Sequence, residues 1–395
     1  MSNQLTVEET ITPASVEELY SACQQIADDP QVLNRFIHEI NEAGFVGEER
    51  ASRLIFLALV SRLLDEPVSI AVKGPSSAGK SHTTKQVLKF FPPKAFYALT
   101  AMSEKALAYT REPLAHRFLV IYEAEGANGK MASYFIRSLL SEGCIDHVTL
   151  VPVGGKEWEQ KHLHVEGPTG LLTTTTLPSL HPENETRLIS VPVNDTPEQT
   201  RRIVKALACG RSRAGIDYAP WHAFQNWLGA GPTEVLIPFA ERLAEACFVG
   251  TVRVRRDFGK LLTLVKAHAL IHRNSRDRTL DGAVVARIED YRAVYSLVLD
   301  LMGEAAQSCV STATRETVAA VAKLLDEGRC DVSVTHLAAE LEIDKSSASR
   351  RVSAAIEGGY LVNGEDRKGH PWKITLGDPL PDDLPILPAP EDLAA

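Results

Sequence analysis

At 395 residues the chain is too long for one ordinary domain and has room for two or three, each able to bury its own core. Its 44% hydrophobic and 24% charged residues are typical of a globular protein, and no apolar run approaches the length that spans a bilayer, so no membrane association is expected. The formal net charge of −9 excludes a protein whose whole surface is basic, so any contact with nucleic acid must be local.

Two further features bear on the cellular compartment. The first fifteen residues are polar and acidic, without the basic start and apolar stretch of a secretory signal, which predicts a cytoplasmic protein. The six cysteines are scattered, with no CxxC pair and no histidine at ligand spacing. We therefore expect reduced thiols rather than disulfides or a zinc site.

Helical spacing dominates the start of the chain, up to about Leu64, and we assign residues 1–50 to an N-terminal helical segment. Residues 51–245 then alternate short β-rich runs with helices and are assigned to the core. The predicted strands are Val68–Val72, Ala95–Thr100, Phe118–Tyr122, Gly170–Thr176 and Leu188–Val193. Strands that alternate with helices predict an α/β fold with a mainly parallel sheet and helices on both faces.

Helices return after the last predicted strand, over Pro197–Cys209, Pro232–Ala246 and Arg256–His272. We assign residues 246–312 to a helical lid with connecting helices, and residues 313–376 to a further small domain. In residues 377–395 prolines alternate with acidic residues. Such a segment has too little apolar surface to bury, so a disordered acidic tail is predicted.

A phosphate-binding loop follows the first predicted strand. Residues Gly74, Pro75, Ser76, Ser77, Ala78, Gly79, Lys80 and Ser81 satisfy the pattern GxxxxGK[ST] between a strand and a helix. The glycines let backbone N–H groups approach phosphate oxygens, and the helix that follows points its positive end at them. Lys80 would neutralise the β- and γ-phosphates and the Ser81 hydroxyl would bind Mg²⁺. The loop therefore predicts a site for ATP and Mg²⁺.

Acidic residues follow the predicted strand Phe118–Tyr122. We expect Glu123 to be the base that activates the attacking water and to take part in Mg²⁺ binding, at the end of a strand neighbouring the loop. Tyr122 stands where an aspartate is expected, which leaves Glu125 or a network of outer-shell waters to take over part of the metal coordination. Two solvated glutamates after a core strand are the alternative.

Several segments together resemble AAA+ ATPases, and more closely the MCM-like replicative helicases of phages, plasmids and other mobile elements. They are the phosphate loop, Ala124–Gly126, Leu139–Gly143 and Leu171–Thr176, and the resemblance covers roughly Leu54 to His272. It implies an AAA+ fold that hydrolyses ATP and acts on DNA. It also implies a homo-oligomeric ring, with a hexamer as the expected size, and a primase or other replication protein as a partner.

The resemblance also assigns roles to polar residues after the loop. Thr175 or Thr176, at the polar end of the fourth strand, matches the sensor position that touches the γ-phosphate or the water. Arg187 matches the arginine finger, which would act on the ATP of a neighbouring subunit. Arg256 matches the second sensor in the lid motif, with Arg255 as a substitute. Surface arginines and a threonine-rich strand end are the alternatives.

A β-hairpin is predicted ahead of the fourth strand, from Asp146–Val151 and Lys161–Val165 around a glycine-rich tip. In MCM-like proteins an insertion in this region faces the central channel. The resemblance therefore implies that Lys156 at the tip contacts DNA, and an ordinary exposed hairpin is the alternative.

The last domain shows three helical patterns and two short strands, Glu316–Leu325, Val334–Leu341, Lys345–Glu357, Tyr360–Asn363 and Trp372–Leu376. The short turn between the second and third helices has helix-turn-helix spacing, and the strands flank a polar loop, so the domain resembles a winged helix. The predicted DNA contacts are Lys345, Ser346, Ser347, Arg350 and Arg351 on the third helix, with Arg367 and Lys368 in the wing. Many winged helices contact proteins instead, and acidic residues here offset the cations.

Three functions are compatible with these motifs. The first is an ATP-driven DNA motor, namely an MCM-like helicase or replication-initiation ATPase of a mobile element. The second is a transposition or loader ATPase that positions partners on DNA without unwinding it, since Tyr122 leaves room for slow hydrolysis. The third is a DNA-binding regulator that uses ATP as a conformational switch.

Overall fold

The structure is a computed structural model that describes residues 13–124, 129–154, 157–177, 180, 182–209, 215–247, 253–307, 310–329, 331–365, 367, 370–380 and 386–393. It divides into two compact units, the first made of Met1–Pro238 with Lys260–Leu297 and the second of Phe239–Gly259 with Val298–Ala395. None of the described helices is both long and apolar enough to cross a membrane.

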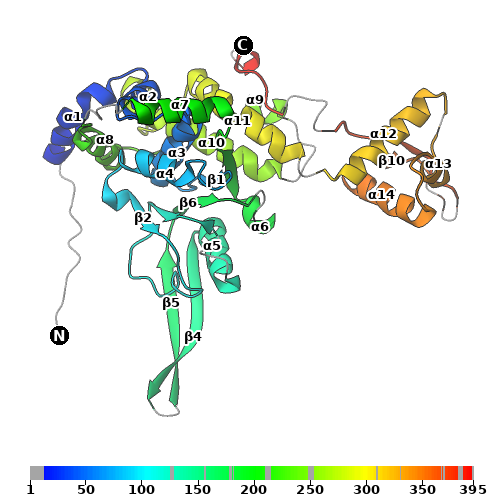
Figure 1. Ribbon diagram of the computed structural model, residues 1–395, viewed down its shortest axis with the longest axis horizontal. Coiled ribbons are helices and arrows are strands. Elements are labelled where there is room, and N and C mark those ends of the chain that lie inside the picture. Colours follow the sequence, from blue (N-terminus) through cyan, green and yellow to red (C-terminus); the bar gives the residue numbers. More distant parts are fainter. Residues whose placement is uncertain are drawn as a thin grey trace. The chain divides into compact units, whose positions relative to one another are not determined.

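A five-stranded parallel sheet forms the centre of the first unit (Figure 1). Its strands are β1 (Ser69–Lys73), β2 (Phe96–Leu99), β3 (Arg117–Ile121), β6 (Thr169–Thr175) and β7 (Leu188–Pro192). They lie in the order β2-β3-β6-β1-β7, and every neighbouring pair is parallel. β1 and β3 are almost continuously buried, as expected of strands that are covered on both faces. The predicted α/β fold is confirmed, and each predicted strand overlaps an observed one.

Helices surround this sheet. They are α1 (Pro13–Ala27), α2 (Val32–Glu42), α3 (Glu49–Val60), α4 (Lys80–Leu88), α5 (Lys130–Glu142), α6 (Pro182–Glu185), α7 (Pro197–Ala208) and α8 (Ala219–Ala230), with α10 (Val254–Ile271) and α11 (Ile288–Gln307) shared by the two units. Rings of Phe36, Phe56, Phe90 and Trp221 cluster with centroids 4.6 to 6.1 Å apart. This cluster joins α2 and α3 of the N-terminal segment to α8 in one core.

The predicted helix Pro232–Ala246 is wrong in its first half. There β8 (Val235–Leu236) pairs in parallel with β9 (Val284–Val285), and α9 (Ala240–Ala246) begins only after Pro238. Proline lacks a backbone N–H and disfavours helical geometry in the residue before it, so a helix does not run through this position. By contrast, α8 lies in a stretch for which the sequence pattern predicts no element.

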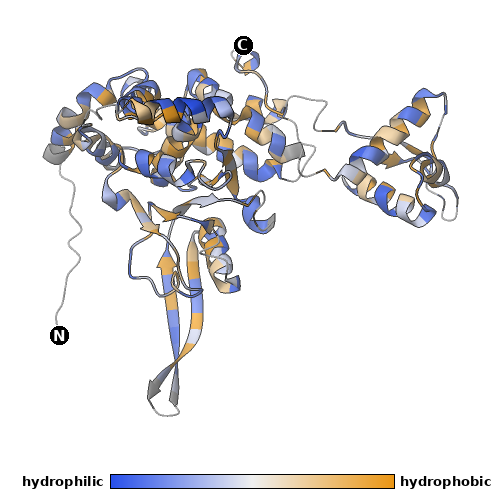
Figure 2. Ribbon diagram, in the orientation of Figure 1, coloured by the Kyte–Doolittle hydropathy of each residue, from blue (hydrophilic) through white to orange (hydrophobic). Residues whose placement is uncertain are grey.

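A long antiparallel hairpin, β4 (Cys144–Gly154) and β5 (Glu157–Glu166), projects from the body of the first unit (Figure 1). Its base is anchored because Ile145 and Val165 are buried in the same core cluster as Phe135 of α5. Further out, hydrophobic and hydrophilic residues alternate along both strands (Figure 2), and Leu150 and Trp158 are exposed. The predicted hairpin is confirmed, with strands longer than predicted.

The second unit contains a small domain of three helices and a two-stranded antiparallel sheet. Its elements are α12 (Thr312–Asp326), α13 (Val334–Glu340), α14 (Lys345–Glu357), β10 (Leu361–Asn363) and β11 (Ile374–Leu376). One apolar cluster, which includes Val321, Leu337, Val352 and Ile374, joins all three helices to β11. Asp344 caps α14, because its carboxylate accepts a hydrogen bond from the Ser347 N–H at 2.9 Å.

The C-terminal segment differs from the disordered tail that its composition predicts. Ile386, Leu387 and Leu393 are buried, and Pro390–Leu393 forms a short 3₁₀ helix. Apolar residues spaced among the prolines give these residues a surface to bury, which a count of prolines and acids overlooks. Residues 381–385, 394 and 395 of the predicted tail lie outside the described residues.

Candidate nucleotide site

The predicted phosphate loop connects the end of β1 to the start of α4. Its conformation requires glycine at two places, because Gly74 and Gly79 have φ angles of +156° and +89°. A Cβ at position 74 would also lie 2.5 Å from Cγ2 of Val193. The chain thus turns sharply at Gly74 and enters α4 at Gly79, so that the N-terminal end of α4 opens into the loop.

Lys80 folds back over this loop. Its ammonium group donates hydrogen bonds to the carbonyl oxygens of Gly74 at 2.8 Å and Pro75 at 2.7 Å, and the residue is only 9% exposed. Both partners are neutral acceptors. A phosphate oxygen carries charge and would be the stronger partner for the same ammonium group.

A cavity of about 370 Å³ lies beside the loop. It is lined by Ser76, Ser77, Gly79, Lys80, Ser81, His82, Glu123, Ala124, Thr174, Thr175 and Thr176. The structure therefore brings the loop, the predicted catalytic glutamate and both candidate sensor threonines into one space. In sequence these residues belong to three separate segments.

The strand order corrects one expectation about Glu123. β3, which leads to Glu123, is not the neighbour of β1, because β6 lies between them. Thr174 of β6 makes the connection, since its hydroxyl oxygen accepts a hydrogen bond from the Glu123 N–H at 3.1 Å. Glu123 has a φ of +71°, a left-handed conformation that costs a non-glycine residue about 1–3 kcal/mol. Such strain is concentrated at functional sites and is retained only when neighbouring groups hold it.

Tyr122 does not line this cavity. The ammonium group of Lys85 lies 5.2 Å from the centre of the Tyr122 ring. The backbone N–H of Tyr122 donates a hydrogen bond to the Leu99 carbonyl oxygen at 3.0 Å. Burial raises the pKa of the Tyr122 phenol above its ordinary value, at which it is already neutral near pH 7. Position 122 therefore packs against α4 and supplies no carboxylate to a metal ion.

Comparison with known families agrees with this geometry. The family model described as "MTBMA_p00010 P-loop domain" matches residues 20–216, which include the whole parallel sheet and the cavity. The chain contains a P-loop NTPase domain. A search among curated proteins finds no match.

A P-loop NTPase usually binds its nucleotide with Mg²⁺, and the residues present suit that ion. The Ser81 hydroxyl and the Glu123 carboxylate line the same cavity, and Mg²⁺ prefers oxygen ligands while keeping several of its waters. When bound, the ion would neutralise charge on the phosphates. Glu125, the predicted substitute for the missing aspartate, lies outside the described residues.

A second, more apolar cavity of about 640 Å³ continues from the phosphate loop of the NTPase domain. It shares Ser76, Ser77, Gly79 and His82 with the phosphate cavity. Its other wall is the apolar side of α7, where Val204 and Leu207 are 58% and 71% exposed. The ring of Phe45 stacks on His82 with centroids 5.8 Å apart.

This groove has the composition expected around a nucleoside, with aromatic and aliphatic surfaces beside the phosphate loop. Sequence analysis misses it. The only sequence signal is the apolar stripe on α7, which is equally typical of a helix packed on the core.

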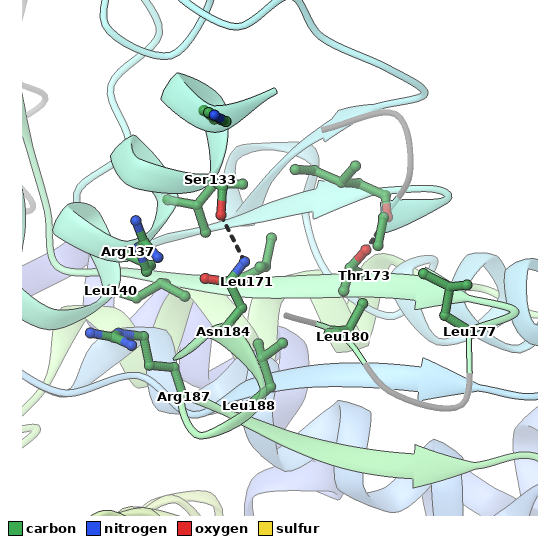
Figure 3. A pocket seen from close by; sticks show the side chains of 14 residues that line it. Ser133, Arg137, Leu140, Leu171, Thr173, Leu177, Leu180, Asn184, Arg187 and Leu188 are labelled. Carbon is green, nitrogen blue, oxygen red and sulfur yellow. Dashed lines mark hydrogen bonds between the residues drawn. The ribbon is translucent and has the colours of Figure 1, made fainter. Parts of the chain in front are cut away.

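Arg187 lies outside the phosphate cavity of the NTPase domain. Its Nε donates to Ser141 Oγ of α5 at 2.6 Å, and its guanidinium also contacts the Glu183 carbonyl oxygen. It lines a separate cavity with Arg137 and Asn184 (Figure 3). The predicted arginine finger is therefore not joined to the loop of its own chain.

An ion pair links the root of the phosphate loop to the segment that carries Arg187. Lys73, the residue before Gly74, contacts the Glu185 carboxylate at 2.5 Å, and Ser190 Oγ donates to the same oxygen at 2.6 Å. Burial alone would raise the pKa of Glu185, but these hydrogen bonds outweigh burial and the pKa lies below its ordinary value. The sequence pattern gives no sign of this link.

The remaining predicted site residues belong mainly to the second unit. Arg256, the predicted second sensor, is exposed near the start of α10. On α14, Lys345, Ser346 and Arg350 are exposed. Ser347 is partly buried and its Oγ accepts from Arg350 at 3.2 Å, whereas Arg351 forms an ion pair with Glu316 at 2.8 Å. Arg367 is exposed, and Lys156 and Lys368 lie outside the described residues.

Another group of ligand-type side chains, His268 of α10, His272 directly after it and Asp290 of α11, is buried. Asp290 accepts four hydrogen bonds, from His268 at 2.7 Å, from Arg276 at 2.6 and 3.0 Å and from the Arg287 N–H at 2.8 Å. A carboxylate has about four acceptor sites, so none remains for a metal ion. We interpret this cluster as a structural polar network.

Proposed function

We propose that this protein is an ATP-hydrolysing AAA+ motor that acts on DNA, of the MCM-like helicase or replication-initiation kind carried by mobile elements. The observation that carries the proposal is the meeting of Lys80, Glu123 and Thr175 in one cavity. A water-activating carboxylate and a polar sensor beside a phosphate loop suit hydrolysis better than binding alone.

Each residue then has a chemical task. Lys80 leaves its two carbonyl partners for oxygens of the β- and γ-phosphates. Glu123 takes a proton from the attacking water, and Thr175 or Thr176 orients that water or the γ-phosphate. Purine and ribose lie in the apolar groove between Phe45 and α7.

The proposal includes a homo-oligomeric ring, with a hexamer as the expected size. Arg187 supports it, because this arginine does not line the phosphate cavity of its own chain, so a role in catalysis requires the cavity of a neighbour. An arginine supplied to a phosphoryl-transfer site stabilises the charge of the transition state and raises kcat by a factor of about 10³–10⁵. Arg256 is proposed as a second sensor.

DNA contact is proposed for the winged helix formed by α12, α13, α14, β10 and β11. Support comes from the exposed start of α14, where Lys345, Ser346 and Arg350 are free of the apolar core. Small polar residues and arginines suit phosphate and base-edge contacts. The hairpin adds an exposed Trp158 near its tip, which suits stacking on unpaired bases. A primase or other replication protein is the proposed working partner.

The test is steady-state ATPase activity of the wild type and of Glu123→Gln, each with no DNA, with single-stranded DNA and with forked DNA. We expect turnover that rises severalfold with DNA and disappears in Glu123→Gln. Lys80→Ala and Arg187→Ala should each be inactive, and mixing them should restore part of the turnover if the site is shared between subunits. Turnover that ignores DNA in every arm would refute the motor.

Tyr122 favours a second candidate. Because no aspartate stands at this position, metal binding is weaker by one carboxylate, which suits slow hydrolysis. A transposition or loader ATPase, or a DNA-binding regulator gated by ATP, needs no fast turnover. DNA binding that depends on ATP, without strand displacement, would favour this candidate over the helicase.

A further inference from the structure

A cavity of about 440 Å³ lies between α5, α6 and the ends of β3 and β6 (Figure 3). Its walls are largely apolar and include Ile136, Leu140, Leu171, Leu180 and Leu188. Of its described lining residues, Ala124 alone also lines the phosphate cavity, and none lines the apolar groove beside Phe45. It is therefore a space of ligand size that the nucleotide site does not use.

One buried polar atom in this cavity lacks a partner. The side-chain amide of Asn184 donates from Nδ2 to Ser133 Oγ at 3.0 Å, while its Oδ1 is buried without a hydrogen bond (Figure 3). Exchanging the amide oxygen and nitrogen does not remove the problem, because Ser133 could then donate to the oxygen and the NH₂ group would be left alone. Buried polar atoms are rarely left unpaired, so this oxygen is suited to accept a hydrogen bond from a water molecule or from a polar group of a ligand in the cavity.

The cavity is also positively charged at one end. Arg137 and Arg187 extend there on either side of Leu140 (Figure 3), and Lys130 is a further lining residue. Glu183 pairs with Arg137, but no described lining residue carries a carboxylate. Three cationic lining residues, with no carboxylate among the described lining residues, favour an anion.

We propose that this cavity is a second ligand site, which binds a small organic anion with an apolar body. The apolar body occupies the leucine-lined space, the anionic head meets Arg137 and Arg187, and a hydrogen-bonding group satisfies Asn184. Binding requires no ATP turnover, and it concerns Arg187 when this residue is not engaged with the nucleotide of a neighbouring subunit. A further consequence rests on that function: because Ala124 follows Glu123 and is shared by both cavities, the bound anion changes turnover more than nucleotide affinity.

The probe is 8-anilinonaphthalene-1-sulfonate, whose fused rings and sulfonate have the proposed chemistry and whose fluorescence rises in apolar surroundings. With the full chain we expect saturable binding at one site, which saturating ATP does not displace. Leu140→Trp and the more exposed Leu177→Trp fill the cavity and should each weaken binding at least tenfold. Arg137→Gln should weaken binding and reduce its salt dependence.

The matched control is Leu207→Ser, which removes an apolar side chain from the nucleoside groove and should leave binding of the probe unchanged. Circular dichroism and thermal melting establish that each variant is folded. Three results would overturn the proposal: no saturable binding to the wild type, binding to both tryptophan variants that is as tight as to the wild type, or displacement by ATP.

Failure of this site and failure of the proposed motor are distinguishable. If the probe binds as expected but ATP turnover is absent, the cavity stands and the motor does not. If turnover responds to DNA but the probe does not bind, the motor stands and the cavity does not.

Discussion

Replacing Thr174 by valine tests whether the buried hydroxyl holds the catalytic glutamate in place. Thr174 is 1% exposed, and valine has nearly the same shape but cannot accept the hydrogen bond from the Glu123 N–H. A fully buried N–H left unpaired costs about 1–3 kcal/mol, and the cost here is smaller because Glu123 itself is exposed at the cavity. The left-handed conformation of Glu123 costs about 1–3 kcal/mol more, so the variant backbone has a strong tendency to relax out of it.

Relaxation moves the Glu123 carboxylate away from the water that it activates. If about 1.4–2.8 kcal/mol of this strain appears in the activation barrier, kcat falls by roughly tenfold to a hundredfold. Nucleotide affinity should change little, because the hydrogen bonds of Lys80 to the loop do not involve Thr174.

Steady-state turnover and binding of a fluorescent ATP analogue separate these two effects, and thermal melting reports whether the variant is folded. Thr174→Ser is the matched control, since it keeps the hydroxyl and should retain most of the activity. An unchanged kcat in a folded Thr174→Val protein would refute the reasoning. So would a serine variant as slow as the valine variant.

Other consequences of the structure are open to direct measurement. Leu207→Ser should weaken ATP binding severalfold in a titration, whereas Leu150→Ser should not, because Leu150 is a largely exposed leucine on the hairpin, away from the groove. Burial lowers the pKa of His272 to about 4, so the unfolded chain binds this proton more readily. Stability should therefore fall as pH drops from 6.5 towards 4, by at most roughly 3 kcal/mol in denaturant titrations, and less in His272→Asn. Arg350→Ala should weaken DNA binding more than Arg351→Ala, because Arg351 is already paired with Glu316; equal losses would contradict this.

Local patterns in the sequence are sufficient for the elements and for the phosphate loop. The phosphate loop is one short segment that contains its glycines, Lys80 and Ser81. Its conformation is therefore determined by residues that are close together in the sequence. The same holds for the hairpin and for the cap of α14 by Asp344, which depend on alternation and on residues three positions apart. Such features need no knowledge of distant parts of the chain.

Only the tertiary structure decided which elements became neighbours. Hydrophobic periodicity indicates the buried side of an element but not the element that covers it. The sequence alone therefore predicted that the strand before Glu123 is the neighbour of β1, whereas β6, with Thr174, lies between them. The contact of Lys73 with Glu185 and the groove between Phe45 and α7 likewise join segments far apart in the chain. Their physical cause is the packing of crossover helices on a parallel sheet, which fixes strand order through interactions that no local pattern encodes.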